Sequence, residues 1–335
     1  MSAPLRIAVI GCGYITQAEH VPSLLSLQPA IDVVAAADPE AERAAAVAAP
    51  FRANAYATLT EVLANEEIEA ILLSTRAPTH LALVTEAAEA GLHILLEKPV
   101  AYSLAEAQAA SAVIERTGVH CMLAYQRRYD DDCRWVRNAL ADGAIGEVRA
   151  AVSLCRLALP SHYRVLAPVG KRPFVASGQD LDDDWLTENS IHHVNLLRFW
   201  LGDPVRVHSA LYRANDHNLG IVTLEFPGQV VVSHHQLRGM DCGEEITLYG
   251  TRGSLRVELW YPHRPYRFPR ITRFTADPPR WEEIIIARDS PYTNEIEHFL
   301  RLVRGETAEN DSSIGDSYRD LAILREIRDR AVYLE

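Results

Sequence analysis

The chain has 335 residues, of which 48% are hydrophobic and 23% charged, so it has a globular composition and a length that predicts two domains. Its formal net charge of -12 excludes nucleic acid as a general partner, because phosphate binding needs a basic surface. No apolar run is long enough to cross a bilayer, so we expect no membrane partner.

The cysteines are five in number and show no metal-ligand spacing such as C-x-x-C. No signal peptide precedes the first predicted strand, so we expect a cytoplasmic protein whose thiols are free and reduced. The cysteines are Cys12, Cys121, Cys133, Cys155 and Cys242.

Strands and helices alternate with short links through the first part of the chain. This alternation predicts parallel strands joined by helical crossovers, hence an α/β Rossmann domain with a doubly wound sheet, over residues 1–124. The predicted strands are 6–10, 31–37, 70–74, 92–96 and 119–124. The predicted helices are 14–27, 40–49, 58–64, 79–90 and 103–117.

After residue 124 the pattern changes to strands that follow one another through turns. It predicts an α+β domain over 125–335 with a large, mostly antiparallel open sheet. The predicted strands are 148–157, 205–212, 220–226, 230–237, 245–249, 254–259 and 282–287. The predicted helices are 131–141, 185–201, 293–303 and 317–333. The long loop 160–184 lacks periodicity, and such loops often serve as active-site lids.

The first predicted strand ends in Gly11-Cys12-Gly13, and a helix follows. Gly11 permits a tight turn, and Gly13 lets the backbone approach a pyrophosphate that the helix N-terminus attracts. Thr16 stands where the usual fingerprint has its third glycine. Asp38 ends the second strand, where a carboxylate accepts hydrogen bonds from ribose hydroxyls and repels a 2′-phosphate. The sequence therefore favours NAD over NADP as cofactor.

Lys98 follows a predicted strand at the carboxyl edge of the sheet, where open α/β sheets bind ligands. An ammonium there can donate a hydrogen bond to a substrate oxygen as negative charge develops on it. The Lys98–Pro99 peptide bond is a candidate for the cis form. Lys98 is therefore a candidate catalytic residue.

Further short motifs occur along the chain. They are Ser74-Thr75 with His80, Glu97-Lys98-Pro99, Tyr125-Gln126-Arg127-Arg128-Tyr129, Gly143-Ala144-Ile145-Gly146-Glu147-Val148, and Glu188-Asn189-Ser190-Ile191-His192 followed by Asn195-Leu196-Leu197-Arg198-Phe199. With the glycine turn and Asp38, this set resembles the glucose–fructose oxidoreductase, inositol dehydrogenase and MocA (Gfo/Idh/MocA) family over essentially the whole chain. Three positions depart from the family pattern: Arg76 replaces a proline, and Glu188 and Asn195 replace aspartates.

The resemblance implies an NAD(P)-dependent dehydrogenase or reductase that acts on CH–OH groups. It implies cofactor contacts from Gly11, Gly13, Tyr14, Ile15, Asp38, Ser74, Thr75, His80, Glu97, Lys98 and Gln126. It implies substrate contacts from Lys98, Arg127, Tyr163, Glu188 and His192. Lys98, His192 and Glu188 are the implied catalytic residues.

The spacing of Glu188 and His192 agrees with these roles, because residues four apart share one helical face. His192 is a suitable general acid/base, and Glu188 can orient it or bind a neighbouring hydroxyl. His193 points about 100° away around the helix, so we interpret it as structural. The pairs 192–193 and 234–235 diverge, and no cysteine or carboxylate set completes a metal site, so we expect no metal.

The family resemblance also implies a small sugar, polyol or cyclitol substrate, or the matching keto-sugar, and a homodimer or homotetramer built through the open sheet face. Three other functions stay open. Tightly bound NAD could serve a net non-redox elimination or glycoside cleavage. The fold could act as a non-enzymatic ligand sensor. The protein could also reduce an imine or a tetrapyrrole-like ligand.

Overall fold

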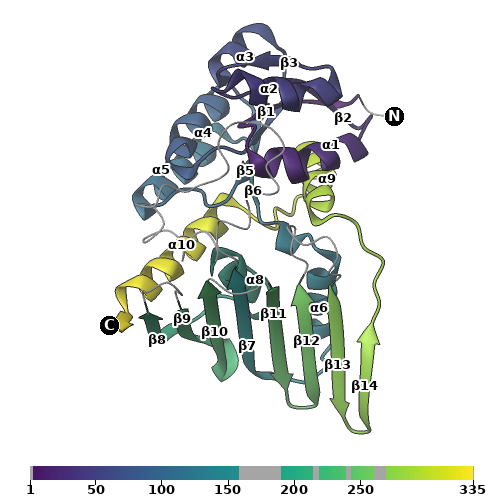
Figure 1. Ribbon diagram of the computed structural model, residues 1–335, viewed down its shortest axis with the longest axis vertical. Coiled ribbons are helices and arrows are strands. Elements are labelled where there is room, and N and C mark those ends of the chain that lie inside the picture. Colours follow the sequence, from purple (N-terminus) through teal and green to yellow (C-terminus); the bar gives the residue numbers. More distant parts are fainter. Residues whose placement is uncertain (1–2, 158–189, 214–218, 239–242, 260–268, 335) are drawn as a thin grey trace. The chain divides into compact units, whose positions relative to one another are not determined.

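The computed structural model describes residues 3–157, 190–213, 219–238, 243–259 and 269–334 (Figure 1). The chain forms two compact units. Of the described residues, 3–129 and 289–321 form the first unit. The second unit contains the described residues within 130–288 and residues 322–334. Residues 289–321 therefore belong to the first unit, although the predicted boundary after residue 124 groups them with the second domain.

The first unit contains the predicted doubly wound sheet. Its six strands lie in the order β3-β2-β1-β4-β5-β6, and every pair is parallel. This is the strand order of dinucleotide-binding Rossmann domains. The strands are β1 (Leu5–Ile10), β2 (Ile31–Ala37), β3 (Asn54–Tyr56), β4 (Ala70–Leu73), β5 (His93–Glu97) and β6 (Cys121–Ala124). The edge strand β3 was not predicted, because three residues carry too short a pattern.

Two helices of the first unit, α3 and α5, begin at a residue whose side chain caps them. Thr58 and Ser103 each accept a hydrogen bond from a backbone N–H of the first turn, and Gly118 ends its helix in the left-handed region. The helices are α1 (Val21–Ser26), α2 (Ala41–Ala48), α3 (Leu59–Asn65), α4 (His80–Glu89), α5 (Leu104–Thr117) and α9 (Pro291–Val303). Helix α9 packs against α1 and β5.

One predicted helix, 14–27, is interrupted. Residues Thr16–His20 form a wider π-helical turn, and α1 begins only at Val21. Pro22 has no N–H, so it cannot form the α-helical bond to the residue four positions earlier. The wide turn brings His20, fully buried, toward the end of β5.

The second unit contains the large open sheet that the sequence predicts. The nine strands lie in the order β14-β13-β12-β11-β7-β10-β9-β8-β15. The sheet is mostly antiparallel, and β7 pairs with β10, and β8 with β15, in parallel. The strands are β7 (Val148–Leu157), β8 (Arg206–Arg213), β9 (Leu219–Phe226), β10 (Val230–Arg238), β11 (Gly243–Gly250), β12 (Gly253–Leu259), β13 (Arg270–Ala276), β14 (Pro279–Ile284) and β15 (Ala331–Leu334).

The prediction of a helix over 317–333 was wrong at its end. Helix α10 (Ile314–Asp329) stops four residues early, and the last described residues form β15 along β8. Unpaired N–H and C=O groups at a sheet edge offer hydrogen bonds to such a segment, and Val332 and its aromatic neighbour favour strand.

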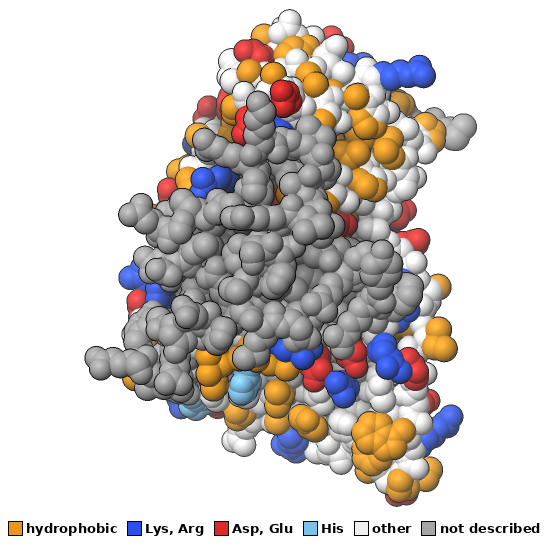
Figure 2. All heavy atoms as spheres, in the orientation of Figure 1, with side chains coloured by type: hydrophobic (Ala, Val, Ile, Leu, Met, Phe, Trp, Pro, Cys, Tyr) orange, Lys and Arg blue, Asp and Glu red, His pale blue; other side chains and the backbone are white. Residues whose placement is uncertain are grey.

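Helices α6 (Asp131–Ala141) and α8 (Ile191–Leu201) cover one face of the second unit's sheet (Figure 1). Trp200 of α8 donates a hydrogen bond from Nε1 to the backbone oxygen of Cys133 in α6, at 2.9 Å. On the opposite face Val152, Val231 and Tyr249 are more than two-fifths exposed. Figure 2 shows hydrophobic side chains among charged ones over this unit.

None of the helices described is long and apolar enough to span a membrane.

Candidate functional site

The glycine turn after β1 has the geometry that a dinucleotide needs. Gly11 has a φ of +90°, and a Cβ there would lie 2.4 Å from the backbone oxygen of Ser74. Only glycine fits such a position. At Gly13, by contrast, no described atom lies within 4 Å of where a Cβ would stand. The turn is therefore closed on its sheet side and open at Gly13, where a pyrophosphate can approach the backbone.

The carboxylate of Asp38 lies beside this turn, at the end of β2. It accepts hydrogen bonds from the backbone N–H groups of Cys12 and Glu40, each at 2.9 Å. Burial, and then the nearby charge of Asp38, raise the pKa of the Cys12 thiol to about 12. Cys12 is therefore a packing residue at physiological pH, and the carboxylate is held ready to accept bonds from a ribose.

The segment after β4 contains Ser74, Thr75 and His80. The Ser74 hydroxyl oxygen is buried and has no hydrogen bond within the described part of the chain. His80 is 1% exposed, with Nδ1 3.0 Å from the Pro99 oxygen and Nε2 3.1 Å from the Thr75 oxygen. Burial lowers its pKa, and the ring lies between backbone oxygens that follow β4 and β5. His80 thus positions the backbone of the site, and Ser74 offers a hydroxyl to a ligand.

At the end of β5, Glu97 is held by a histidine that sequence reasoning missed. Its Oε1 lies 2.8 Å from Nε2 of the buried His20, and its Oε2 accepts the backbone N–H of Lys98 at 3.2 Å. The Lys98–Pro99 bond is cis, as the sequence suggested. Lys98 itself is half-buried. In the sequence, His20 is an ordinary histidine in the middle of the predicted helix 14–27, and no local pattern connects it with Glu97.

The remaining cofactor candidates lie around the same edge of the sheet. Tyr14 and Ile15 follow the glycine turn and are half-buried. Gln126 and Arg127 are buried in the short 3₁₀ turn directly after β6. Five consecutive strand ends of the first unit thus carry candidate residues, as expected for a Rossmann ligand site.

A group of acidic side chains is buried beside Glu97. Glu295 of α9 is fully buried, and neither carboxylate oxygen has a hydrogen bond within the described residues. Burial, and then the charge of Glu97, raise the pKa of Glu295 well above its usual value. Burial also raises the pKa of Glu19 to about 7 and that of Tyr292 well above its normal range. Burial therefore favours the neutral, protonated form of the Glu295 carboxyl.

We expect Glu295→Gln to stabilise the protein increasingly as pH rises. A carboxyl whose pKa is higher in the folded state contributes stability that is present below the unfolded pKa and is lost as pH rises toward the folded pKa. The melting temperature of the variant should exceed that of the wild type by about 3 °C at pH 8 and by less at pH 4. Thermal unfolding across this range measures the difference. Glu297→Gln, at an exposed position of the same helix, is the control and should change little.

In the second unit, the catalytic candidate His192 is half-buried in the first turn of α8. Asn195, one turn later, is fully buried. The other two predicted residues of this part of the chain, Glu188 and Tyr163, lie outside the described residues, as does the predicted lid 160–184. Lys98 and His192 belong to different units, so their meeting at one substrate atom stays a prediction.

His193 lies under the helix, on the sheet, as its predicted structural role requires. Its Nδ1 is 2.7 Å from the Ser153 hydroxyl, which is also 3.0 Å from Nδ1 of His234. Nε2 of His234 lies 3.3 Å from the Ser190 hydroxyl, which donates a hydrogen bond to Gln236. Burial above all lowers the pKa of His234 well below its usual value, so that ring is neutral. A buried polar chain thus connects α8 to β7 and β10.

The residues of the first unit fit a nicotinamide dinucleotide. The backbone faces open space at Gly13, a carboxylate stands at the end of β2, and a buried hydroxyl at Ser74 has a hydrogen bond to offer. Each of these features lies at the carboxyl edge of the parallel sheet. Gly11, Gly13 and Asp38 would hold the adenosine and pyrophosphate part of such a cofactor.

Two family models match the chain. Residues 5–125 match the GFO/IDH/MocA oxidoreductase family with an NAD-binding Rossmann fold. Residues 133–256 match the GFO/IDH/MocA C-terminal domain.

Individual relatives share about a quarter of their residues with this chain. D-apiose dehydrogenase of Paraburkholderia graminis is 27% identical over 95% of this chain and 85% of its own length. The scyllo-inositol 2-dehydrogenase (NAD(+)) of Bacillus subtilis strain 168 is 26% identical over 91% of this chain and 87% of its own length. Among solved structures, the 3-ketoreductase KijD10 from Actinomadura kijaniata, in complex with TDP-benzene and NADP, matches with a TM-score of 0.80 at 19% identity, over 99% of this chain and all of that chain. The last similarity shows the shared fold.

Proposed function

Because this chain belongs to the GFO/IDH/MocA family of NAD-binding oxidoreductases, we propose that it transfers hydride between NAD and a sugar, polyol or cyclitol. The single observation that carries this proposal is the edge of the parallel sheet. There a glycine turn, the carboxylate of Asp38 and the ammonium-bearing Lys98 follow three strands of one sheet. The names of relatives such as D-apiose dehydrogenase and scyllo-inositol 2-dehydrogenase support the substrate class.

In this proposal Lys98 and His192 act at one oxygen of the substrate. The bound nicotinamide would supply the hydride acceptor in oxidation and the hydride donor in reduction. Lys98 donates a hydrogen bond to the reacting oxygen and stabilises the negative charge that develops there. His192 takes the hydroxyl proton when the alcohol is oxidised and returns it when the ketone is reduced. Glu188 orients His192 or binds a neighbouring hydroxyl, and Tyr163 and Arg127 contact the rest of the substrate.

The backbone around Lys98 supports this role. Glu97 accepts the Lys98 N–H, and the His20 ring holds Glu97 from the other side. His80 connects the next peptide, at Pro99, to Thr75. A catalytic ammonium works best from a backbone that does not move, since small displacements at a reacting centre cost much rate.

The substrate class is tested by screening sugars, inositols and sugar acids with NAD, and the matching ketones with NADH, following NADH absorbance. We expect turnover of at least one polyol or keto-sugar. No response to any of them would contradict the proposal. Purified protein that retains NAD without exchanging it would then favour a net non-redox elimination or glycoside cleavage.

We further propose that the protein assembles as a homodimer or homotetramer through the uncovered face of the sheet. Val152, Val231 and Tyr249 lie exposed on that face, more than two-fifths of each being accessible in the single chain. Burying such side chains against a second copy is favourable. Light scattering should give twice or four times the mass of one chain, and a Val152→Lys, Val231→Lys variant should shift it toward the monomer.

A further inference from the structure

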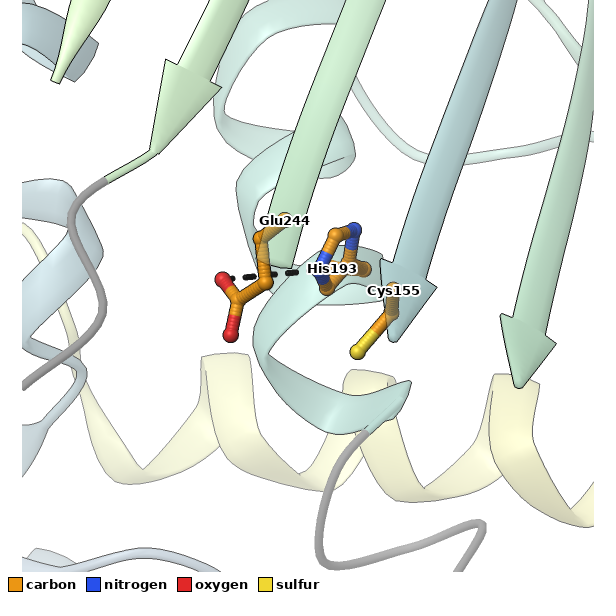
Figure 3. A group of neighbouring side chains, drawn as sticks. All are labelled: Cys155, His193 and Glu244. Atoms are coloured by element: carbon orange, nitrogen blue, oxygen red, sulfur yellow. Dashed lines mark ion pairs between the residues drawn. The ribbon is translucent and has the colours of Figure 1, made fainter. Parts of the chain in front are cut away.

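We propose that Cys155, His193 and Glu244 form a zinc site inside the second unit. This inference is independent of the proposed hydride transfer. The Cys155 sulfur, a ring nitrogen of His193 and a carboxylate oxygen of Glu244 all lie within 4.8 Å of one another. Cys155 and His193 are each 1% exposed and Glu244 is 9% exposed. Figure 3 shows the three side chains gathered, with the His193 ring between the other two.

Strand pairing creates this group from distant parts of the sequence. Cys155 of β7 and Glu244 of β11 are direct partners on neighbouring antiparallel strands, so their side chains point to the same face. Helix α8 covers that face and supplies His193. No cysteine or carboxylate stands at metal-ligand spacing from the histidine pairs along the sequence, but the fold brings one of each to His193.

The ring of His193 has one nitrogen held and one available. Its Nδ1 lies 2.7 Å from the Ser153 hydroxyl. Its Nε2 is buried and forms no hydrogen bond within the part of the chain described here, and the nearest carboxylate oxygen, of Glu244, is 3.5 Å away. A histidine that binds a metal characteristically fixes its second nitrogen on a hydrogen-bond partner in this way. Nε2 is therefore directed into the group as a ligand.

The hydrogen-bond chain beyond Ser153 holds the His193 ring in this orientation. The Ser190 hydroxyl donates to the Gln236 carbonyl oxygen and lies 3.3 Å from Nε2 of His234. The Ser153 hydroxyl lies 3.0 Å from Nδ1 of His234 and 2.7 Å from Nδ1 of His193. With Nδ1 held there, Nε2 faces the Glu244 carboxylate at 3.5 Å, a contact that Figure 3 marks as an ion pair. A divalent cation bound between the two groups would replace that contact, because metal ligands bind in their deprotonated form.

The ligand types select the metal class. A thiolate, an imidazole and a carboxylate suit Zn²⁺ and exclude Mg²⁺ and Ca²⁺, which take oxygen ligands. Ligands about 2.1 Å from a tetrahedral ion lie about 3.4 Å apart, close to the 3.5 Å between His193 and Glu244. The fourth position is left for water or another ligand. Because its ligands come from β7, α8 and β11, the ion would fasten α8, which also carries His192, to the sheet.

The test uses the full-length protein, first stripped with a chelator and then titrated with Zn²⁺ or Co²⁺ alone. We expect one equivalent of Zn²⁺ per chain by elemental analysis. We also expect sulfur-to-Co²⁺ charge-transfer absorption, which only a thiolate ligand gives. Cys155→Ser should lose that absorption and most of the zinc affinity. Cys133→Ser, which removes another buried thiol of the same unit, should keep both.

A second variant tests the hydrogen-bond chain. Ser153→Ala leaves all three ligands in place, so it should keep the charge-transfer absorption and weaken zinc binding about 10- to 100-fold. If Cys155→Ser does not fold, as judged by circular dichroism, the wild-type Co²⁺ spectrum decides alone. Wild-type protein that binds less than one equivalent of Zn²⁺, or binds Co²⁺ without sulfur absorption, overturns the proposal. Full zinc affinity in folded Cys155→Ser overturns it equally.

Discussion

Lys98→Met should lower kcat about 10²- to 10⁴-fold while dinucleotide affinity changes only a few-fold. The ammonium is proposed to stabilise charge on the reacting oxygen, and removing one such donor typically costs two to three orders of magnitude. Lysine is rare in this chain, with two residues against many arginines. Arginine cannot replace it at a single substrate oxygen, because its planar fork differs in shape from a compact ammonium. Lys98→Arg should therefore also be slow.

His192→Ala should cause a loss of similar size, since the proton then has no acceptor at the reacting oxygen. The measurement is steady-state kinetics with the substrate found in the screen, with dinucleotide binding followed by fluorescence. His208→Ala, at an exposed histidine of β8, is the control and should keep wild-type turnover. A His192→Ala enzyme with unchanged kcat would remove the general acid/base role.

The double variant tests whether the two side chains share one oxygen. Effects of groups that act on the same atom are strongly non-additive. Lys98→Met with His192→Ala should therefore be little slower than the slower single variant. Two losses that multiply would show that the residues act at separate places.

Asp38→Asn should raise kcat/KM for NADP about 10- to 100-fold and lower it for NAD. The carboxylate repels a 2′-phosphate and accepts bonds from ribose hydroxyls, and hydrogen bonds to a charged group contribute about 1.5–3 kcal/mol. A change of 1.4 kcal/mol corresponds to a factor of ten. The wild type should prefer NAD. Kinetics with both dinucleotides give the ratio directly.

The design of this variant preserves the turn as far as possible. Asparagine keeps an oxygen that can accept one of the two backbone bonds, from Cys12 or Glu40, while it removes the charge. Asp32→Asn is the matched control, because Asp32 lies on the same strand near its other end. A wild-type preference for NADP, or an Asp38→Asn ratio equal to that of the wild type, would show that Asp38 does not select the cofactor.

Local patterns were sufficient for five of the six strands in the first unit's sheet and for its glycine turn. Its buried strands, the glycine turn and Asp38 are each readable within a few residues, and parallel strand ends necessarily meet at one edge of the sheet. Lys98 could be placed at that edge for the same reason. The X–Pro pair made the bond before Pro99 a candidate for the cis form, which it adopts. The sheet class of the second unit followed from strand runs separated by turns.

Contacts between distant residues were not readable in this way. No local signal shows that His20 holds Glu97, that Glu295 lies fully buried, or that β15 extends the sheet beside β8. These outcomes depend on which segments pack together. The wide π turn before α1 and the early end of α10 likewise reflect competition between helix propensity and hydrogen bonds or packing elsewhere.

The amino-acid sequence by itself determined the fold class and the position of the glycine turn, Asp38 and Lys98 at the carboxyl edge of the parallel sheet. Each of these depends on periodicity or on a motif next to a strand. Only the tertiary structure brought Cys155, His193 and Glu244 together. Their meeting required β7 to pair with β11 on one side and β10 on the other, and α8 to cover the face they share. Strand order and register are set by the packing of the whole sheet, so no spacing along the chain encodes them.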